Sequence, residues 1–376
     1  MLALRITLPA GTDAPGGDTK VTIQKRYRDP ASRLPWRRHA SSEMTETAVL
    51  PPLRAYGRGA AALPAELRDG LRDLAGRVSP ESVRVCLDVD PALDRMPWEA
   101  LLSYPVVTGN PPRPGALDFW RWGERLPMTG RPNPPHPPRR AVVLADSSRR
   151  LFAERTALAR ELSFPDLSAR RIIDVNLAVE RVGSAAVDPP DVVLVIGRPV
   201  RLENSVLLQT TEHVATYGIS ADDLREAFVN SGPLEAQVVA GLRACLFVVL
   251  GAPAESSSRF DTERRDAALL RAWAADVFRA GTAAVISLPS LPPQLAEAVL
   301  KDIAEEIQDG ITSRALHAAV RAARKEIRTW AQPAPTDGDP HDGGAAATER
   351  QVEQALDVCL FRRGRTPDFT TSEERV

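Results

Sequence analysis

The side chains that could form a covalent intermediate or transfer a proton are few and scattered along the 376 residues. There is no Gly-rich phosphate loop ending in Lys-Ser or Lys-Thr, no HExxH segment and no G-x-S-x-G elbow. The cysteines Cys86, Cys245 and Cys359 form no CxxC pair, which argues against a zinc site or a disulfide framework and favours a reducing, cytoplasmic compartment. We predict no cofactor and no metal. Each histidine is interpreted as solvated or satisfied within the core: His39, His136, His213, His317 and His341.

Two apolar runs that reach a glycine point to one candidate site. Asp191–Val200 and Leu246–Pro253 each contain an unbroken series of β-branched or aromatic residues, which is typical of a strand buried on both faces of a parallel sheet. In open α/β sheets, functional groups lie just beyond the carboxyl ends of such strands. Arg198-Pro199 follows the first glycine and Ala252-Pro253 follows the second. None of these residues is a nucleophile or a general base.

The composition is that of a globular protein with one large or two smaller domains. Hydrophobic residues make up 43% and charged residues 26%, and the formal net charge is -1. This charge gives no reason to expect a nucleic-acid partner. No apolar run approaches the roughly 18 residues that span a bilayer. Met1–Pro9 is a poor signal peptide, so we expect no membrane association.

The first part of the chain predicts a β-rich region. A Gly/Asp/Pro turn joins two alternating segments into a hairpin, and a polar, irregular stretch covers 29–47. A short helix would turn Trp98, Leu101 and Leu102 inward. The Pro- and Gly-rich stretch Tyr104–Pro138 is interpreted as a surface loop, with a proline-motif ligand as the alternative. Strands are expected over 2–8, 20–25 and 83–89 and a helix over 63–78.

From Arg140 onward, strand patterns alternate with helical spacing, which favours a parallel sheet covered by helices. Ser205–Tyr217 is interpreted as a hairpin insertion, and Thr312 or Ser313 as a helix N-cap. Strands are expected over 141–145, 171–175, 192–196, 246–250 and 283–288, and helices over 150–162, 177–182, 220–229, 261–280, 292–308 and 312–330.

Met96-Pro-Trp-Glu-Ala-Leu resembles the Pro-Trp-Glu-x-Leu signature of CHAT domains, a family of caspase-like cysteine peptidase domains. The resemblance runs from Val83 to Trp330 and fades toward Phe361, and it rests on the order and spacing of several segments. These are the strand that ends at Gly197, Ile219-Ser-Ala-Asp-Asp-Leu, Val248-Val-Leu-Gly-Ala, Ala280-Gly-Thr-Ala-Ala-Val-Ile and the closing helix Ala315–Ile327.

The resemblance implies a cysteine–histidine dyad, in which a thiolate attacks a peptide carbonyl and the histidine transfers protons. The family's Gly-His-Gly would fall where this chain has Gly197-Arg198-Pro199, and its Ser-Ala-Cys would fall at Gly251-Ala252-Pro253. Arginine stays protonated and cannot act as a general base. Proline supplies neither a nucleophile nor a backbone N–H for an oxyanion hole. The resemblance therefore predicts an inactive member, with degenerate dyad positions at Arg198 and Pro253.

A relocated nucleophile is the alternative to inactivity. A hydroxyl close after Pro253 could reach the site, but it needs an adjacent base, and Arg198 occupies the nearest natural base position. Cys245 precedes its strand, at the amino-terminal end, so it is interpreted as a small buried apolar residue. The candidate hydroxyls are Ser256, Ser257 and Ser258.

Arg198 itself has two interpretations. It is either solvated or paired to a carboxylate such as Asp191 or Glu255. Alternatively, it lines a remnant cleft with Pro253 and Glu255 and binds a carboxylate or phosphate of a partner or ligand.

We therefore predict an α/β fold, a caspase-like three-layer α/β/α sandwich with a mostly parallel sheet and an N-terminal β-rich extension. Residues 1–79 form the extension with one helix, and residues 80–330 the CHAT-like domain with its Pro-rich loop at 105–138. Residues 331–376 form a mobile linker with a last strand at 355–361 and a polar tail. Trp98 and Glu99 are expected to be structural, the tryptophan packing near the sheet and the glutamate accepting from backbone donors.

The expected function is binding without catalysis. The chain would be a CHAT-type pseudoprotease that scaffolds or regulates a protein partner, such as an active peptidase. The family resemblance adds a role in a bacterial conflict or anti-phage defence system. Two other classes stay open: an active caspase-like peptidase with a relocated nucleophile, and a sensor that binds a ligand in the remnant cleft.

Overall fold

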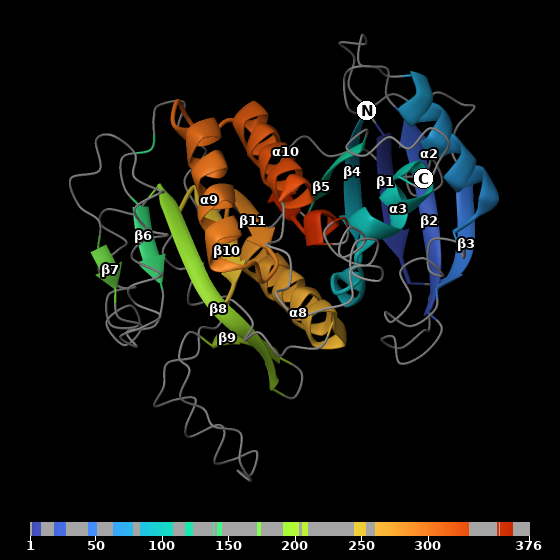
Figure 1. The fold of residues 1–376 in the computed structure, drawn as a ribbon. Coiled ribbons are helices and arrows are strands. Elements are labelled where there is room, and N and C mark those ends of the chain that lie inside the picture. Colours follow the sequence, from blue (N-terminus) through green and yellow to red (C-terminus); the bar gives the residue numbers. More distant parts are fainter. Residues whose placement is uncertain are drawn as a thin grey trace, which may run out of the picture. The chain divides into compact units, whose positions relative to one another are not determined.

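In the computed structural model, the alternating and apolar segments of the sequence form strands that belong to two units (Figure 1). The first unit is Met1–Gly123 with Arg362–Val376, and the second is Glu124–Phe361. The expected helices at 150–162, 177–182 and 220–229 and most of the expected linker lie outside the described residues. The structure describes residues 2–8, 19–27, 44–50, 63–77, 83–107, 117–122, 138, 141–144, 171–173, 191–202, 205–209, 244–252, 260–330, 352 and 354–363.

The first unit contains the strand order β3-β2-β1-β4-β5. β1 and β2 pair antiparallel, as the predicted hairpin requires, and β3 pairs antiparallel with β2. β4 is parallel to both β1 and β5. The expected domain boundary at residue 79 thus falls inside one sheet, because β4 hydrogen-bonds to the N-terminal strand. The strands are β1 (Leu2–Thr7), β2 (Thr19–Tyr27), β3 (Met44–Leu50), β4 (Val83–Val89) and β5 (Leu117–Trp122).

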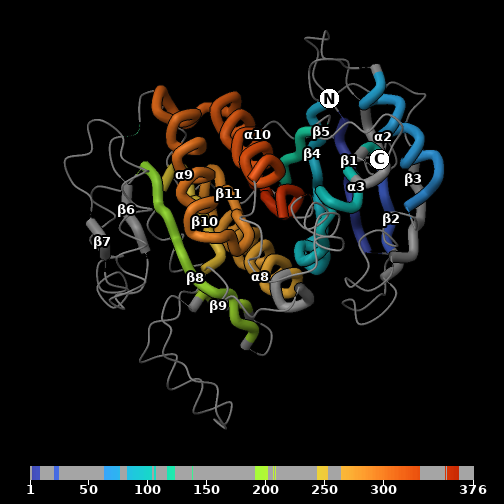
Figure 2. Tube along the Cα trace, viewed as in Figure 1, coloured from blue at the N-terminus to red at the C-terminus, as the bar shows by residue number. Residues whose placement is uncertain are grey.

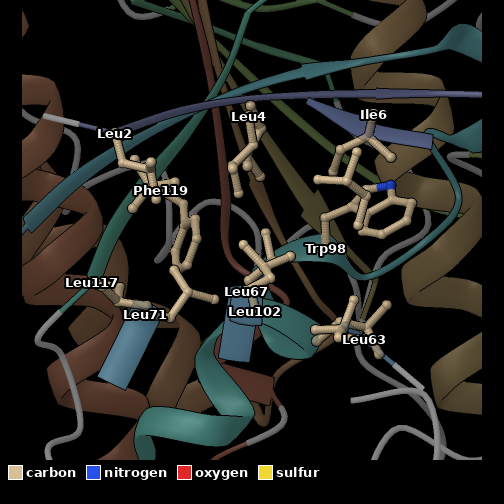
Figure 3. Packing of buried hydrophobic residues seen from close by; sticks show 14 of the residues in the cluster. Leu2, Leu4, Ile6, Leu63, Leu67, Leu71, Trp98, Leu102, Leu117 and Phe119 are labelled. Atoms are coloured by element: carbon tan, nitrogen blue, oxygen red, sulfur yellow. The ribbon is translucent and has the colours of Figure 1, made fainter. Parts of the chain in front are cut away.

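Two helices bury their apolar stripes against one face of this sheet. They are α2 (Ala65–Arg77) and α3 (Trp98–Val107), and both match predicted helices. Figure 3 shows Leu67 of α2 and Trp98 of α3 among the leucines and the phenylalanine of β1 and β5. Trp98 is fully buried, and its indole Nε1 donates to the carbonyl of Leu93 at 3.2 Å. This burial is compatible with the structural role predicted for the tryptophan.

Two predictions for this unit were wrong. β3 occupies 44–50, so the end of the expected irregular stretch 29–47 is a strand. The expected loop 104–138 contains the end of α3 and the whole of β5. β5 lacks the usual alternation because its polar residues Asp118 and Arg121 are buried along with its apolar ones.

The second unit contains the strand order β12-β11-β10-β8-β6-β7. Adjacent pairs from β7 to β11 are parallel, and β9 is an antiparallel addition to β8. In chain order the parallel strands read 2-1-3-4-5, which is a doubly wound order. The predicted α/β fold with a mostly parallel sheet is therefore confirmed. The strands are β6 (Ala141–Leu144), β7 (Arg171–Ile173), β8 (Val192–Leu202), β9 (Ser205–Gln209), β10 (Leu246–Gly251), β11 (Ala284–Leu288) and β12 (Cys359–Arg362).

Three helices of the second unit lie where the spacing predicted them: α8 (Phe260–Arg279), α9 (Pro293–Ile307) and α10 (Ser313–Thr329). The strand face that carries Val195 and Phe247 shares a core cluster with α8, whereas Leu194 and Val248 on the opposite face are also fully buried. Burial on both faces explains the unbroken apolar runs. α9 and α10 run side by side (Figure 2). Of the two predicted N-caps of α10, Thr312 is the one observed, and its Oγ1 accepts from the Ala315 N–H at 3.1 Å.

The last strand of the unit is held by two buried arginines. Arg271 Nη1 of α8 donates to Asp357 Oδ1 at 2.9 Å, and Arg324 Nη2 of α10 donates to the carbonyl of Val358 at 2.6 Å. The ring of Phe361 lies 6.0 Å from that of Phe278, centroid to centroid. A strand was predicted at 355–361, and it covers Cys359–Arg362.

Candidate functional site

Gly197 of β8 lies beside the carboxyl ends of β10 and β11 in the second unit's sheet, and we call this place the rim. Gly251 at the end of β10 stands opposite Gly197 of β8 in the parallel register. The Ala252 N–H donates to the Gly197 carbonyl at 2.8 Å, so the ladder continues one residue beyond β10. The two glycines singled out in the sequence are therefore adjacent in space.

β8 does not end at Gly197, contrary to the prediction. It continues to Leu202 and turns back as β9, with Arg198 opposite Gln209 and Pro199 opposite Leu208. Pro199 has no N–H and is compatible with a strand that needs a ladder on one side only. The hairpin insertion expected from residue 205 onward thus begins with β9, which pairs with the extended end of β8.

Arg198 is an exposed cation at the rim. Its side chain is 63% exposed, and its Nε lies 3.5 Å from Asp266 Oδ2 of α8. Asp191 was a predicted partner, but it lies at the opposite end of β8, where its carbonyl accepts from the N–H groups of Cys245 and Leu246. The other predicted partner, Glu255, lies outside the described residues. A carboxylate does pair with Arg198, but it comes from a helix 68 residues further along the chain.

The Arg198–Asp266 pair leaves most of the guanidinium open to other anions. Charge-assisted N–H···O bonds are about 2.7–2.9 Å long, so 3.5 Å is a loose ion pair. An exposed pair of this kind contributes about 1 kcal/mol or less to stability. A guanidinium carries five N–H donors in a planar fork that matches a carboxylate or a phosphate. The rim can therefore bind an anionic group.

Ser290 is a rim residue that the sequence analysis missed. Its Oγ donates to the Ala252 carbonyl at 2.6 Å. A Cβ on Gly251 would lie 2.7 Å from the Ser290 backbone nitrogen, so the segment after β11 packs directly on that glycine. The sequence could have indicated Ser290, because this residue closely follows β11, a parallel strand that was correctly predicted.

Gly251→Ala should destabilise the second unit by about 1–3 kcal/mol, because the added methyl group forces the Ser290 backbone away from β10. Urea denaturation would measure this change. Gly76→Ala on α2 is the matched control, since nothing lies within 4 Å of its Cβ position, and it should be neutral or stabilising. Equal effects of the two substitutions would contradict the close packing at Gly251.

The remaining predicted site residues divide into two groups. Cys245 is fully buried before β10, as predicted, and His317 is buried on α10. The degenerate dyad position Pro253, Glu255 and the candidate nucleophiles Ser256, Ser257 and Ser258 lie outside the described residues.

Glu99 of the Trp-Glu signature belongs to the first unit, in a buried ion pair that sequence reasoning did not find. Arg121 of β5 donates to both Glu99 carboxylate oxygens, from Nε at 2.8 Å and from Nη2 at 2.7 Å. Its Nη1 also donates to the carbonyl of Asp94 at 2.9 Å, and Nη2 to that of Met96. The expected role of Glu99 is structural, and a guanidinium is one of its partners.

Comparison with known proteins identifies no relative: neither a protein-family model nor a curated protein matches this chain. In the part of the chain that the structure describes, no group of three or more His, Cys, Asp or Glu residues could hold a metal ion. None of the helices described there is long and apolar enough to cross a bilayer.

Proposed function

We propose that the chain is a CHAT-type pseudoprotease of caspase-like fold that acts by binding a protein partner at the rim, where Arg198 takes a carboxylate or phosphate of that partner. The partner would be an active peptidase or another component of a bacterial conflict system.

The doubly wound sheet supports the proposal. Sheets of this order bind ligands outside the carboxyl ends of their strands, and the rim lies at that edge. A three-layer sandwich also requires helices on both faces, and the burial of Val192 to Gly197 in β8 and of β10 and β11 is compatible with that arrangement.

The observation that carries the proposal is the exposed guanidinium of Arg198 beside Gly197. In the resemblance, this is the position of a catalytic histidine. An arginine stays protonated at neutral pH, so it can hold an anion but cannot remove a proton. Recognition is the chemistry that this residue retains.

The Ser290 hydroxyl gives no support for catalysis. The Ser290 Oγ–H bond points to a backbone carbonyl, which is not a base and does not raise the nucleophilicity of the oxygen. The three cysteines are buried, and burial raises the pKa of the Cys86 thiol well above its ordinary range. A buried thiol that stays protonated is a poor nucleophile.

Arg198→Glu should abolish co-purification of the partner from the native organism, because a repulsive charge replaces an attractive one. The tagged whole chain would be compared with this variant and with Arg72→Glu. Arg72 is a suitable control because it is also an exposed arginine with one surface ion pair, to Asp69 on α2. The Arg72 variant should retain the partner at the wild-type level.

Electrophilic probes test the absence of catalysis in the same preparations. Fluorophosphonate and iodoacetamide reagents should label the folded chain no faster than a free serine or cysteine, with thiol labelling appearing only in denaturant. Rapid labelling at Cys245, Ser290 or a serine after Pro253, lost on substitution by Ala, would favour the active peptidase. Partner binding that survives Arg198→Glu would refute the rim as the binding surface.

A further inference from the structure

The helices α9 and α10 form a hairpin whose two arms carry opposite charge. The short segment from Gln308 to Thr312 joins them, and they pack along each other (Figure 2). α9 contains four carboxylates and one lysine, whereas α10 contains five cations and one carboxylate. The acidic residues are Glu297, Asp302, Glu305 and Glu306, and the cations of α10 are Arg314, Arg321, Arg324, Lys325 and Arg328.

Most of these charges lie on the outer stripes of the two helices. Arg314, Arg321 and Lys325 are exposed, and their spacing of seven and four residues places them on one face of α10. Glu305 and Glu306 are likewise exposed on α9. The inner stripes are apolar and buried, apart from His317 and Arg324 on α10. The outer surface of the hairpin therefore has an acidic half and a basic half.

Each helix keeps an excess of its own charge, as the residues of α9 and α10 show. The two halves do interact within the chain: burial and the neighbouring Glu305 raise the pKa of Asp302 on α9, and Lys301 and Lys325 act in the opposite direction. On α10, burial and the neighbouring Arg324 lower the pKa of Arg328.

A surface with an acidic and a basic half side by side is complementary to itself. Suppose that two copies face each other and are related by a two-fold axis that runs parallel to the helices. Then α9 of each copy lies against α10 of the other copy. A two-fold axis across the helices would instead place like charges together. Charge complementarity thus selects one arrangement of two copies.

We propose that the outer face of the α9–α10 hairpin is a self-association surface, on which a second copy of this chain docks with acidic α9 against basic α10. This interface is separate from the rim.

The dimensions of the hairpin predict a weak dimer. Helices of 15 and 17 residues are about 22–26 Å long, and two helices side by side are about 20 Å wide. Such an area lies at the lower end of specific interfaces, and its exposed ion pairs are screened by salt. Association should therefore be measurable at high protein concentration and low salt, and it should weaken as salt is added.

Charge-reversal variants of the full chain test the arrangement by sedimentation velocity. One variant carries Glu305→Lys and Glu306→Lys, and the other carries Arg314→Glu and Lys325→Glu. Each alone should dimerise at least about 10-fold more weakly than the wild-type chain, since like charges now face each other. Circular dichroism checks that both variants fold.

Mixing the two variants gives the decisive result. On the exposed residues, one variant then has a net positive charge on both helices and the other a net negative charge on both, so a mixed dimer is complementary on both sides and should regain the wild-type affinity. Combining all four substitutions in one chain should also restore self-association.

A wild-type chain that stays monomeric at about 20 mM salt, where screening is weak, would overturn the proposal, and the face would then serve a different partner or none. Dimerisation that neither variant weakens would place the interface elsewhere. Arg198→Glu should leave dimerisation unchanged, so failure here is distinguishable from failure of the rim proposal.

Discussion

Arg121→Met is expected to lower the free energy of unfolding of the first unit by about 3–5 kcal/mol. The substitution leaves the fully buried Glu99 carboxylate without its bidentate partner and removes the donors that satisfy the carbonyls of Asp94 and Met96. Most of the loss comes from a charge left in a dry environment rather than from the attraction itself. Urea denaturation followed by circular dichroism would measure it.

The same sheet provides a matched control in Arg5→Met. Arg5 Nε of β1 lies 2.7 Å from Asp88 Oδ2 of β4, but the two side chains are 33% and 17% exposed. Its loss should cost less than the loss of Arg121, because water reaches the remaining carboxylate in part. Replacing Glu99 by Leu together with Arg121→Met should recover part of the stability, since the buried Glu99 charge is gone as well, whereas Asp94, whose Oδ1 lies 3.7 Å from Arg121 Nη1, still loses its partner. Equal losses for the two arginine variants would contradict the role of burial.

Asp357→Ala should destabilise the second unit by a similar amount, about 3–5 kcal/mol. Arg271 is 1% exposed and loses the carboxylate that its Nη1 contacts. Because Asp357 lies just before β12, the loss should also loosen that strand. Hydrogen exchange would detect faster exchange of the β12 amides together with a lower denaturation midpoint.

Asp276→Ala on α8 is the control for this second pair. Asp276 contacts Arg279 one helical turn away, at 3.2 Å, and its side chain is half-exposed. Removing it should cost about 0.5 kcal/mol or less and should leave exchange of β12 unchanged. A midpoint equally low in both variants would show that Asp357 has no special role.

Most of the described strands and helices of the second unit could be predicted because each has a regular burial pattern. β10 and β11 are apolar at every position but one, and α8, α9 and α10 repeat apolar residues at helical spacing, so each pattern has a single interpretation. The same reasoning placed Gly197 and Gly251 at one edge of the sheet. Their adjacency in the register confirms that part of the site.

What the sequence could not show depends on contacts between distant residues. β5 was hidden within a Pro- and Gly-rich stretch, and its Asp118 and Arg121 are buried although such residues usually face solvent. The preceding strand was predicted to end at Gly197, and the pairing with β9 extends β8 through Arg198 and Pro199. The partner of Arg198 on α8 is set by tertiary packing, for which a single sequence carries no signal.

The attachment of β12 has a consequence for biosynthesis. Arg271 and Arg324 are translated well before Asp357 and Val358, their partners. During translation both guanidinium groups must stay hydrated until the chain beyond residue 358 leaves the ribosome. α8 and α10 therefore reach their final packing only after Asp357 and Val358 have been made, and the unit closes late, through contacts of high sequence separation. Until then, helper proteins that shield apolar helices would find α8 and α10 accessible.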